Sequence, residues 1–213
     1  MKKIMFNDKY GLTQAVLDGQ KTMTRRVFYI PDKLALKYYV ETDNLVICDT
    51  QHNGNIIEWR DSNDNVRMTF QPKYEVGEVI AIAQSYKDSG YAPDSLDRHP
   101  KDLSVRGLMK DSAGWNNKMF VKSYACKHHI KITNIKVERL QDISDGDCLK
   151  EGIIKGKCGS ESTHFMDAYY VPKEKQPYCT PRDAFDCLID KVSGKYTWER
   201  NPFVFVYEFV LVD

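Results

Sequence analysis

The chain closes on a long apolar segment, NPFVFVYEFVLVD, at residues 201–213. Its aromatic and β-branched residues favour an extended strand. Apolar residues that follow one another without alternation are typical of a strand that is covered on both faces. We therefore expect a strand from about Phe203 in the interior of a sheet, so earlier parts of the chain must supply strands on either side of it.

Several earlier segments have the composition of strands separated by turns. The pair Asn53-Gly54 lies between two apolar runs and predicts a hairpin, because Asn-Gly suits a tight turn. A strand is also expected from about Glu78 to Tyr86, after the turn at Gly77. The segments with strand character are KTMTRRVFYI, NLVICDTQHNGNIIEWRD, VRMTFQP, EVGEVIAIAQSY and KMFVKSYACKHHIKITNIKVERL.

Three segments predict helices. In DKYGLTQAVLDG the apolar residues recur at helical spacing, and Gly19 stands where a helix-ending glycine belongs. In ISDGDCLKEGI, Ser144 is a good N-cap and forms an S-x-x-D box with Asp147. In TPRDAFDCLIDKVSG, Thr180 caps a helix that Gly194 ends.

This order of elements predicts an α+β fold. With 213 residues and no linker or repeat, we expect one domain, 1–213, built around a small and mostly antiparallel barrel with a few peripheral helices. Three ranges, about 31–73, 87–117 and 153–179, are interpreted as insertions into it. The last two are polar and are expected to be irregular loops.

The charges exclude a uniformly basic surface. The chain has 31 basic and 30 acidic residues, a net charge of +1, so contact with nucleic acid would need a local patch. Within 118–139, six cations stand against Glu138 alone, and six minus one gives +5. This basic stripe is either a solvated strand face or a surface that faces phosphates. Its cations are Lys118, Lys122, Lys127, Lys131, Lys136 and Arg139.

The sequence predicts a cytoplasmic protein without a cofactor. No signal peptide and no apolar stretch of membrane-spanning length stand out, so the six cysteines are expected to be reduced thiols. Cys126 and His128 could share a strand face, but two ligands do not make a zinc site. No P-loop and no dinucleotide-binding glycine pattern is found. We expect no metal and no cofactor.

The stretch GQKTMTRR, at 19–26, gathers three cations and two hydroxyls without an acid. It lies where a helix is expected to pass into a strand, and such junctions commonly carry sites. Far along the chain, Glu151 occupies the last turn of a predicted helix, where the helix dipole disfavours a carboxylate. An acid tolerated there is expected to have another partner.

The segment DGQKTMTRR is similar to the G-x-K-x-x-(E/T)-x-R signature of ASCH domains, a branch of the PUA-like β-barrel superfamily. Further pieces resemble this family in the same order: YEVGEVIAI, ITNIKVERLQDIS, CLKEGI and WERNPFVFVYEF. The chain resembles the longer ASCH proteins of phages and prophages over about half its length. IAQSYKD stands where those longer members carry a stretch similar to VRETW.

The resemblance implies an activity and its residues. One ASCH branch hydrolyses the amide of N4-acetylcytidine with a lysine, a threonine and a glutamate, which match Lys21, Thr24 and Glu151 here. Thr24 would act as nucleophile or position a water, and Glu151 would move a proton or orient Lys21. Lys21 would need a lowered pKa to take a proton, and burial beside Arg25 and Arg26 would favour that. The two arginines are assigned to substrate binding.

A second function remains open from the sequence. A PUA-like module could bind RNA or modified DNA without chemistry, through the basic stripe and aromatic stacking. A ribonuclease is a weaker possibility that also comes from the family resemblance. Under either main function the partner is a nucleoside or RNA, and the loops 87–117 and 153–179 are expected to border the pocket. Candidate substrate contacts outside the signature are Trp115, Trp198 and Asn201.

Overall fold

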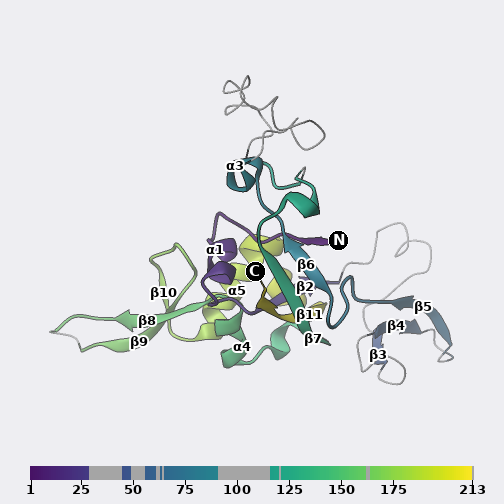
Figure 1. Ribbon diagram of the computed structural model, residues 1–213. Helices are drawn as coiled ribbons and strands as arrows, with labels where there is room; N and C mark the ends of the chain where they lie inside the picture. Colours follow the sequence, from purple (N-terminus) through teal and green to yellow (C-terminus); the bar gives the residue numbers. More distant parts are fainter. Residues whose placement is uncertain are drawn as a thin grey trace, which may run out of the picture.

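The computed structural model describes residues 1–28, 45–48, 56–60, 63, 65–90, 116–119, 121–161 and 164–212. Within these ranges the chain is α+β, as predicted, with three sheets and several short helices. Figure 1 shows the largest sheet in the body of the molecule and a smaller sheet toward each side.

The largest sheet has five strands in the order β1-β6-β7-β11-β2. β11 pairs with β7 on one side and with β2 on the other, so the prediction that the last strand is interior is confirmed. The pair β1–β6 is parallel, and the other pairs in this sheet are antiparallel. The strands are β1 (Lys3–Ile4), β2 (Met23–Val27), β6 (Val79–Ile82), β7 (His129–Arg139) and β11 (Phe203–Leu211).

A second sheet confirms the predicted hairpin in its pairing. β3 (Leu45–Cys48) runs antiparallel to β4 (Ile56–Arg60), which pairs in turn with β5 (Val66–Phe70). Asn53 and Gly54 themselves lie outside the described residues. Ile57 is fully buried and belongs to the main hydrophobic core, so this sheet is attached to the body by apolar packing.

The third sheet corrects the prediction that 153–179 is irregular. β8 (Ile154–Cys158), β9 (Met166–Tyr170) and β10 (Pro177–Tyr178) form an antiparallel sheet, and β8 and β9 extend away from the body in Figure 1. The strands were missed because most of β8 is solvent-exposed on both faces, so no apolar alternation marks it. An exposed Lys155–Asp167 ion pair of 2.8 Å joins the two strands.

Two strand predictions were too long. The strand expected over 78–86 ends at Ile82, because Ser85 instead accepts a hydrogen bond from the Asp88 amide and starts a helix at Tyr86. The strand expected over 118–139 begins only at His129. The helices are α1 (Leu12–Leu17), α3 (Tyr86–Ser89), η4 (Ser123–Ala125), η5 (Leu140–Asp142), α4 (Asp145–Lys150), α5 (Pro181–Ser193) and α6 (Thr197–Arg200).

The main core lies between the five-stranded sheet and α5. Ile130 and Ile132 of β7 are fully buried, as are Val204 and Val206 of β11. α5 buries Ala184, Phe185, Leu188 and Ile189, the apolar face of its predicted helix, in the same cluster.

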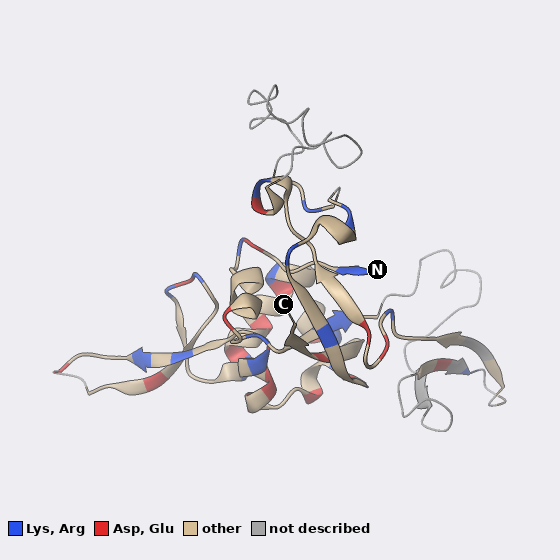
Figure 2. Ribbon diagram, viewed as in Figure 1, with Lys and Arg blue, Asp and Glu red and all other residues tan. Residues whose placement is uncertain are grey.

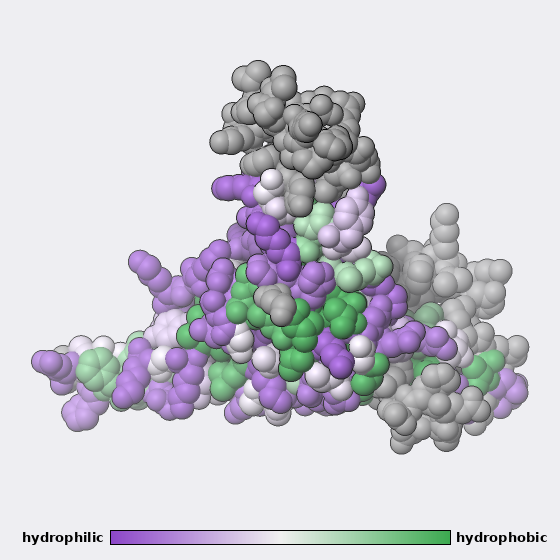
Figure 3. Space-filling model, in the orientation of Figure 1, coloured by the Kyte–Doolittle hydropathy of each residue, from purple (hydrophilic) through white to green (hydrophobic). Residues whose placement is uncertain are grey.

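The surface is mixed in charge, as the net charge of +1 requires (Figure 2). Figure 3 shows hydrophilic side chains over most of one face, with apolar ones gathered near the end of β11. The basic stripe does not form one row. Lys118 is buried against Asp8 at 2.5 Å, and Lys136 pairs with Glu138 at 2.8 Å. Arg139 lies 3.8 Å from the centre of the Phe203 ring.

The N-cap of α5 supplies a test of this architecture. The Thr180 hydroxyl accepts a hydrogen bond from the Asp183 amide at 3.1 Å, and Pro181 occupies the first turn. We expect Thr180→Ala to lower the free energy of unfolding by about 1 kcal/mol, because it leaves that amide without a cap. Thr180→Ser keeps the oxygen and should lose little. Urea denaturation followed by circular dichroism measures both, and equal loss in the two variants would contradict the cap.

Candidate functional site

The end of α1 fixes the backbone of Lys21. Gly19 has a φ of 71°, which allows the chain to turn back, and the amides of Gln20 and Lys21 both donate to the Ala15 carbonyl at 2.9 and 2.8 Å. The next amide, that of Thr22, donates to the Lys150 carbonyl at 3.0 Å. The segment 19–26 is therefore joined directly to the end of α4, more than a hundred residues away.

Glu151 follows α4 and turns into the protein. Gly152 has a φ of 106°, and a side chain there would meet Leu12 and Lys21 within 3.7 Å. The Lys21 ammonium donates to Glu151 Oε2 at 2.5 Å and to the Glu151 carbonyl at 2.8 Å. Both side chains are buried, with 2% and 5% of their surface exposed. The prediction that Glu151 has another partner is confirmed.

Arg25 extends this pair into a larger network of charges. It donates to Glu151 Oε1 at 3.2 Å, to Glu138 Oε1 at 2.9 Å through Nε, and to Asp147 Oδ2 at 3.2 Å. Lys136 completes the network by contacting Glu138 at 2.8 Å and Asp147 at 3.3 Å. Lys150, which is half exposed, also reaches Asp147 at 3.6 Å, so four cations face three carboxylates in this network.

Burial lowers the pKa of the buried cations in this network, and their carboxylate partners raise it. Burial lowers the pKa of Lys21 below its usual value; Glu151 opposes this shift, and Arg26 and Arg25 add to it. Burial also acts to lower the pKa of Arg25, but Glu151, Glu138 and Asp147 together hold it above its usual value. Arg25 therefore stays charged, while Lys21 is the member whose proton is held less tightly than usual.

Thr24 lies on the opposite face of β2 from Met23 and Arg25, because side chains alternate along a strand. It is 5% exposed. Within the described part of the chain its hydroxyl makes no hydrogen bond. A buried hydroxyl without a partner costs free energy, so a ligand or water that satisfied it would be favoured there.

Lys21, Thr24 and Glu151 line one cavity of about 130 Å³. Sequence reasoning missed its apolar wall. Phe6 precedes α1, and its ring centre lies 6.0 Å from the Lys21 ammonium and 5.7 Å from the Arg26 guanidinium. The described residues of the lining are Met5, Phe6, Asn7, Leu12, Lys21, Thr24, Arg25, Arg26, Val27, Glu151, Phe185, Leu188, Ile189, Val192 and Ser193.

The apolar wall explains the lowered pKa of Lys21 and could not be assigned from sequence. The helical spacing of Phe185, Leu188 and Ile189 predicts an apolar face, but it does not say what that face covers. The cavity shares Met5, Phe6, Asn7, Arg26 and Val192 with a wider depression of about 630 Å³. The depression supplies a mouth for the cavity.

The candidate contacts outside the signature are not brought to this cavity. Trp198 packs against Phe185 with ring centres 6.2 Å apart, and Asn201 Oδ1 accepts from the Gln141 amide at 2.8 Å. Both brace the corner between η5 and α6, and neither is among the described residues of the cavity lining. Trp115 lies outside the described residues.

Metal-ligating side chains do not gather in the part of the chain that the structure describes, where no group of three or more His, Cys, Asp or Glu could hold an ion. Cys126 is buried, and its thiol lies 3.6 Å from the Lys122 carbonyl. Five cysteines form no disulfide among the described residues: Cys126, Cys148, Cys158, Cys179 and Cys187.

Comparison with known proteins leaves the site to be interpreted from its geometry. No family model, curated protein or solved structure matches this chain. Across the described ranges, no helix has the length and apolar character needed to cross a membrane.

The buried pair predicts how stability depends on pH. Glu151→Gln removes the charge that opposes the lowering of the Lys21 pKa, so that pKa falls further in the folded state. Below it, the folded protein carries an uncompensated buried charge, and stability returns as the pH rises toward about 10.4, where unfolded lysine titrates. We expect a loss of about 3 kcal/mol near pH 6 that shrinks by pH 9. Urea denaturation at both pH values measures it.

Glu78→Gln is the matched control for this prediction. Glu78 contacts Lys2 at 3.0 Å, but that lysine is 43% exposed, so the pair contributes less than about 1 kcal/mol. We expect little change in stability and no dependence on pH between 6 and 9. A loss in Glu151→Gln that is as large at pH 9 as at pH 6 would contradict the role of Lys21 in the effect.

Proposed function

We propose that this protein is a PUA-like ASCH domain that hydrolyses the amide of N4-acetylcytidine or a closely related acylated cytosine. In this proposal the five-stranded sheet belongs to the barrel of that fold. The observation that carries it is the gathering of Lys21, Thr24 and Glu151, all buried, around one cavity. Local spacing does not impose this gathering, because Glu151 comes from a separate helix end.

The three groups suit the steps of amide hydrolysis. An oxygen nucleophile must add to the acyl carbon, and the C–N bond to the exocyclic N4 then breaks as N4 takes a proton. Thr24 provides the hydroxyl that holds the attacking water, or that itself attacks to form an ester which water then hydrolyses. Lys21, in the neutral form that its lowered pKa favours, takes the proton that the attacking oxygen loses and delivers it to N4, and its contact of 2.5 Å to Glu151 orients it. The products are the free acid and the free amine of cytosine.

Arg25 holds the carboxylate of Glu151 in one orientation. It donates to the Glu151 oxygen that Lys21 does not use, so both oxygens of the carboxylate are held. Because each oxygen has its own cation, the side chain cannot rotate without losing a charged hydrogen bond. Arg25 is therefore a positioning residue in this proposal. Arg26, on the other face of β2, is left to contact the substrate.

The size of the cavity limits what enters it. A cavity of about 150 Å³ holds a benzene ring, so about 130 Å³ fits one pyrimidine ring or its acyl group but not a whole nucleoside. The acyl end of the base would occupy the cavity, and the rest of the nucleoside would lie in the wider depression at its mouth.

Two explanations without catalysis fit the same residues less well than hydrolysis does. A buried ion pair can be purely structural, and by itself it contributes little net stability. A binding module without chemistry could also use a polar cavity. Neither explains why a buried hydroxyl that has no partner among the described residues lines the same cavity as a lysine whose pKa is lowered. That combination favours hydrolysis.

Substitutions at the three residues test the proposal. We expect Lys21→Met to lower the turnover of N4-acetylcytidine at least about 100-fold, because it removes the group that exchanges the proton. Thr24→Ala should be comparably inactive and Thr24→Ser partly active, since serine keeps the hydroxyl. Glu151→Gln keeps the shape and removes the charge, so it should also lose most of the rate. Chromatography of cytidine released from N4-acetylcytidine measures all four variants.

Lys150→Met is the matched control. Lys150 lies beside Glu151 at the end of α4, but its side chain is 50% exposed and its ion pair to Asp147 is 3.6 Å long. The control should retain the wild-type rate. Equal turnover by wild type and Lys21→Met, or no turnover of acylated cytidines by the wild type, would overturn the proposal.

A further inference from the structure

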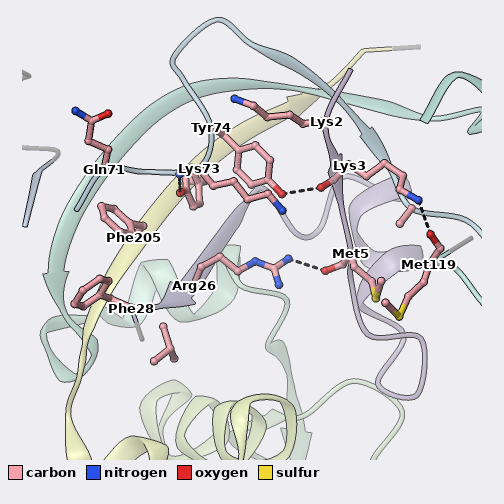
Figure 4. A pocket seen from close by; sticks show the side chains of 13 residues that line it. Lys2, Lys3, Met5, Arg26, Phe28, Gln71, Lys73, Tyr74, Met119 and Phe205 are labelled. Atoms are coloured by element: carbon pink, nitrogen blue, oxygen red, sulfur yellow. Dashed lines mark hydrogen bonds between the residues drawn. The ribbon is translucent and has the colours of Figure 1, made fainter. Parts of the chain in front are cut away.

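A larger pocket adjoins the cavity across a shared wall. Its volume is about 700 Å³, within the range of ligand pockets, and Figure 4 shows its side chains. It shares Met5, Arg26 and Val27 with the cavity. The described residues that line it are Lys2, Lys3, Met5, Arg26, Val27, Phe28, Gln71, Lys73, Tyr74, Ala83, Met119, Phe205 and Tyr207.

The described lining carries four cations and no carboxylate. Only Lys2 forms an ion pair among the described residues, to Glu78 at 3.0 Å. Lys3 donates to the carbonyls of Met119, at 3.0 Å, and Val121, which satisfies hydrogen bonds without neutralising its charge. The described part of the lining therefore has an uncompensated positive charge, which favours an anionic ligand.

Arg26 and Lys73 present this charge to one region of the pocket. In Figure 4 both side chains extend to the space between β2 and the N-terminal segment. The Arg26 guanidinium donates to the Met5 carbonyl at 2.6 Å, so its position is fixed at the shared wall. Lys73 is exposed, and its ammonium lies 5.4 Å from the centre of the Tyr74 ring.

Aromatic rings form the floor of the same pocket. Tyr74 and Tyr207 are buried edge to face, 5.1 Å apart, and Phe205 is buried beside them. Phe28 is half-buried and packs edge to face against Phe70, with ring centres 4.5 Å apart. Cations beside a partly exposed ring are the combination that binds single-stranded nucleic acid, by charge and by base stacking.

The face of β2 connects the two pockets. Thr24, Arg26 and Phe28 follow one another at alternate positions, with about 6.6 Å between neighbours on the same face. Thr24 lines the cavity, Arg26 lines both spaces, and Phe28 lines the larger pocket. The mouth depression is a poorer phosphate site, because its Lys118 is already paired with Asp8 at 2.5 Å.

We propose that the larger pocket binds the phosphate and the neighbouring nucleotide of a single strand whose acylated cytosine enters the cavity. This inference rests on the proposed function for the identity of the base, but the binding of a strand can be tested without any hydrolysis. The preferred substrate is then a base within a strand, unstacked so that its acyl end enters the small cavity.

Charge reversal at Lys73 tests the pocket, and Lys9 offers a close match. Both lysines are exposed, and each ammonium lies 5.4 Å from the ring centre of the tyrosine that follows it, Tyr10 or Tyr74. Lys9 is not among the described residues that line either pocket. Lys73→Glu and Lys9→Glu therefore make the same change in similar surroundings, one inside the proposed site and one outside it.

The binding experiment uses fluorescein-labelled hexacytidylate and fluorescence anisotropy at two salt concentrations. We expect Lys73→Glu to weaken binding roughly tenfold and to reduce the salt slope by about 1, while Lys9→Glu matches the wild type. Competition by cytidine 5′-monophosphate separates the two sources of phosphate. If the mononucleotide competes as well as unlabelled hexacytidylate, the pocket binds a single nucleotide, and the proposal that it binds a strand is wrong. Equal binding by wild type, Lys73→Glu and Lys9→Glu would overturn the pocket itself.

A hydrolysis experiment separates this inference from the proposed function. We expect Lys73→Glu to lower kcat/KM roughly tenfold on a trinucleotide with central N4-acetylcytidine and to leave kcat/KM on free N4-acetylcytidine unchanged. If Lys73→Glu lowers neither, the inference fails while the proposed function stands. If no acylated substrate is hydrolysed but Lys73→Glu still weakens strand binding, the function fails and the pocket stands.

Discussion

Two cations reach the buried carboxylate of Glu151 from separate points of the segment 19–26. Lys21 holds one oxygen at 2.5 Å, and Arg25 holds the other at 3.2 Å. An isolated carboxylate at 5% exposure would be costly. The contact also determines chain geometry, because the end of α1, the start of β2 and the end of α4 must all meet at this point.

The backbone supports the same meeting point without charges. The Thr22 amide bonds to the Lys150 carbonyl, and the Phe209 amide of β11 bonds to the Thr22 carbonyl at 2.9 Å. One residue therefore links the interior strand of the main sheet to the end of α4. A site built on such a junction is held more firmly than one on a free loop, because the hydrogen bonds of the sheet fix the backbone that carries its side chains.

Sequence patterns predicted the elements better than their contacts. The interior position of β11, the cap at Thr180 and the need of Glu151 for a partner follow from local chemistry, and each was found. The hairpin β8–β9 was missed because its exposed strands lack an apolar period. Glu138 and Asp147 were not assigned to the site because nothing in their own segments indicates Arg25, which lies more than a hundred residues earlier. Contacts of that range depend on how the sheet and α4 pack.

The alternation of β2 explains why a near-neutral chain concentrates cations at residues 21–26. Arg25 faces the carboxylates of the buried network, and Lys21 reaches the same network from the loop before the strand. Thr24 and Arg26 face the other way, so Arg26 finds no carboxylate among the described residues and bonds only to a carbonyl. The two adjacent arginines therefore have different roles. The charge of Arg25 is used within the fold, while the charge of Arg26 remains at the wall between the two pockets, available to an anion.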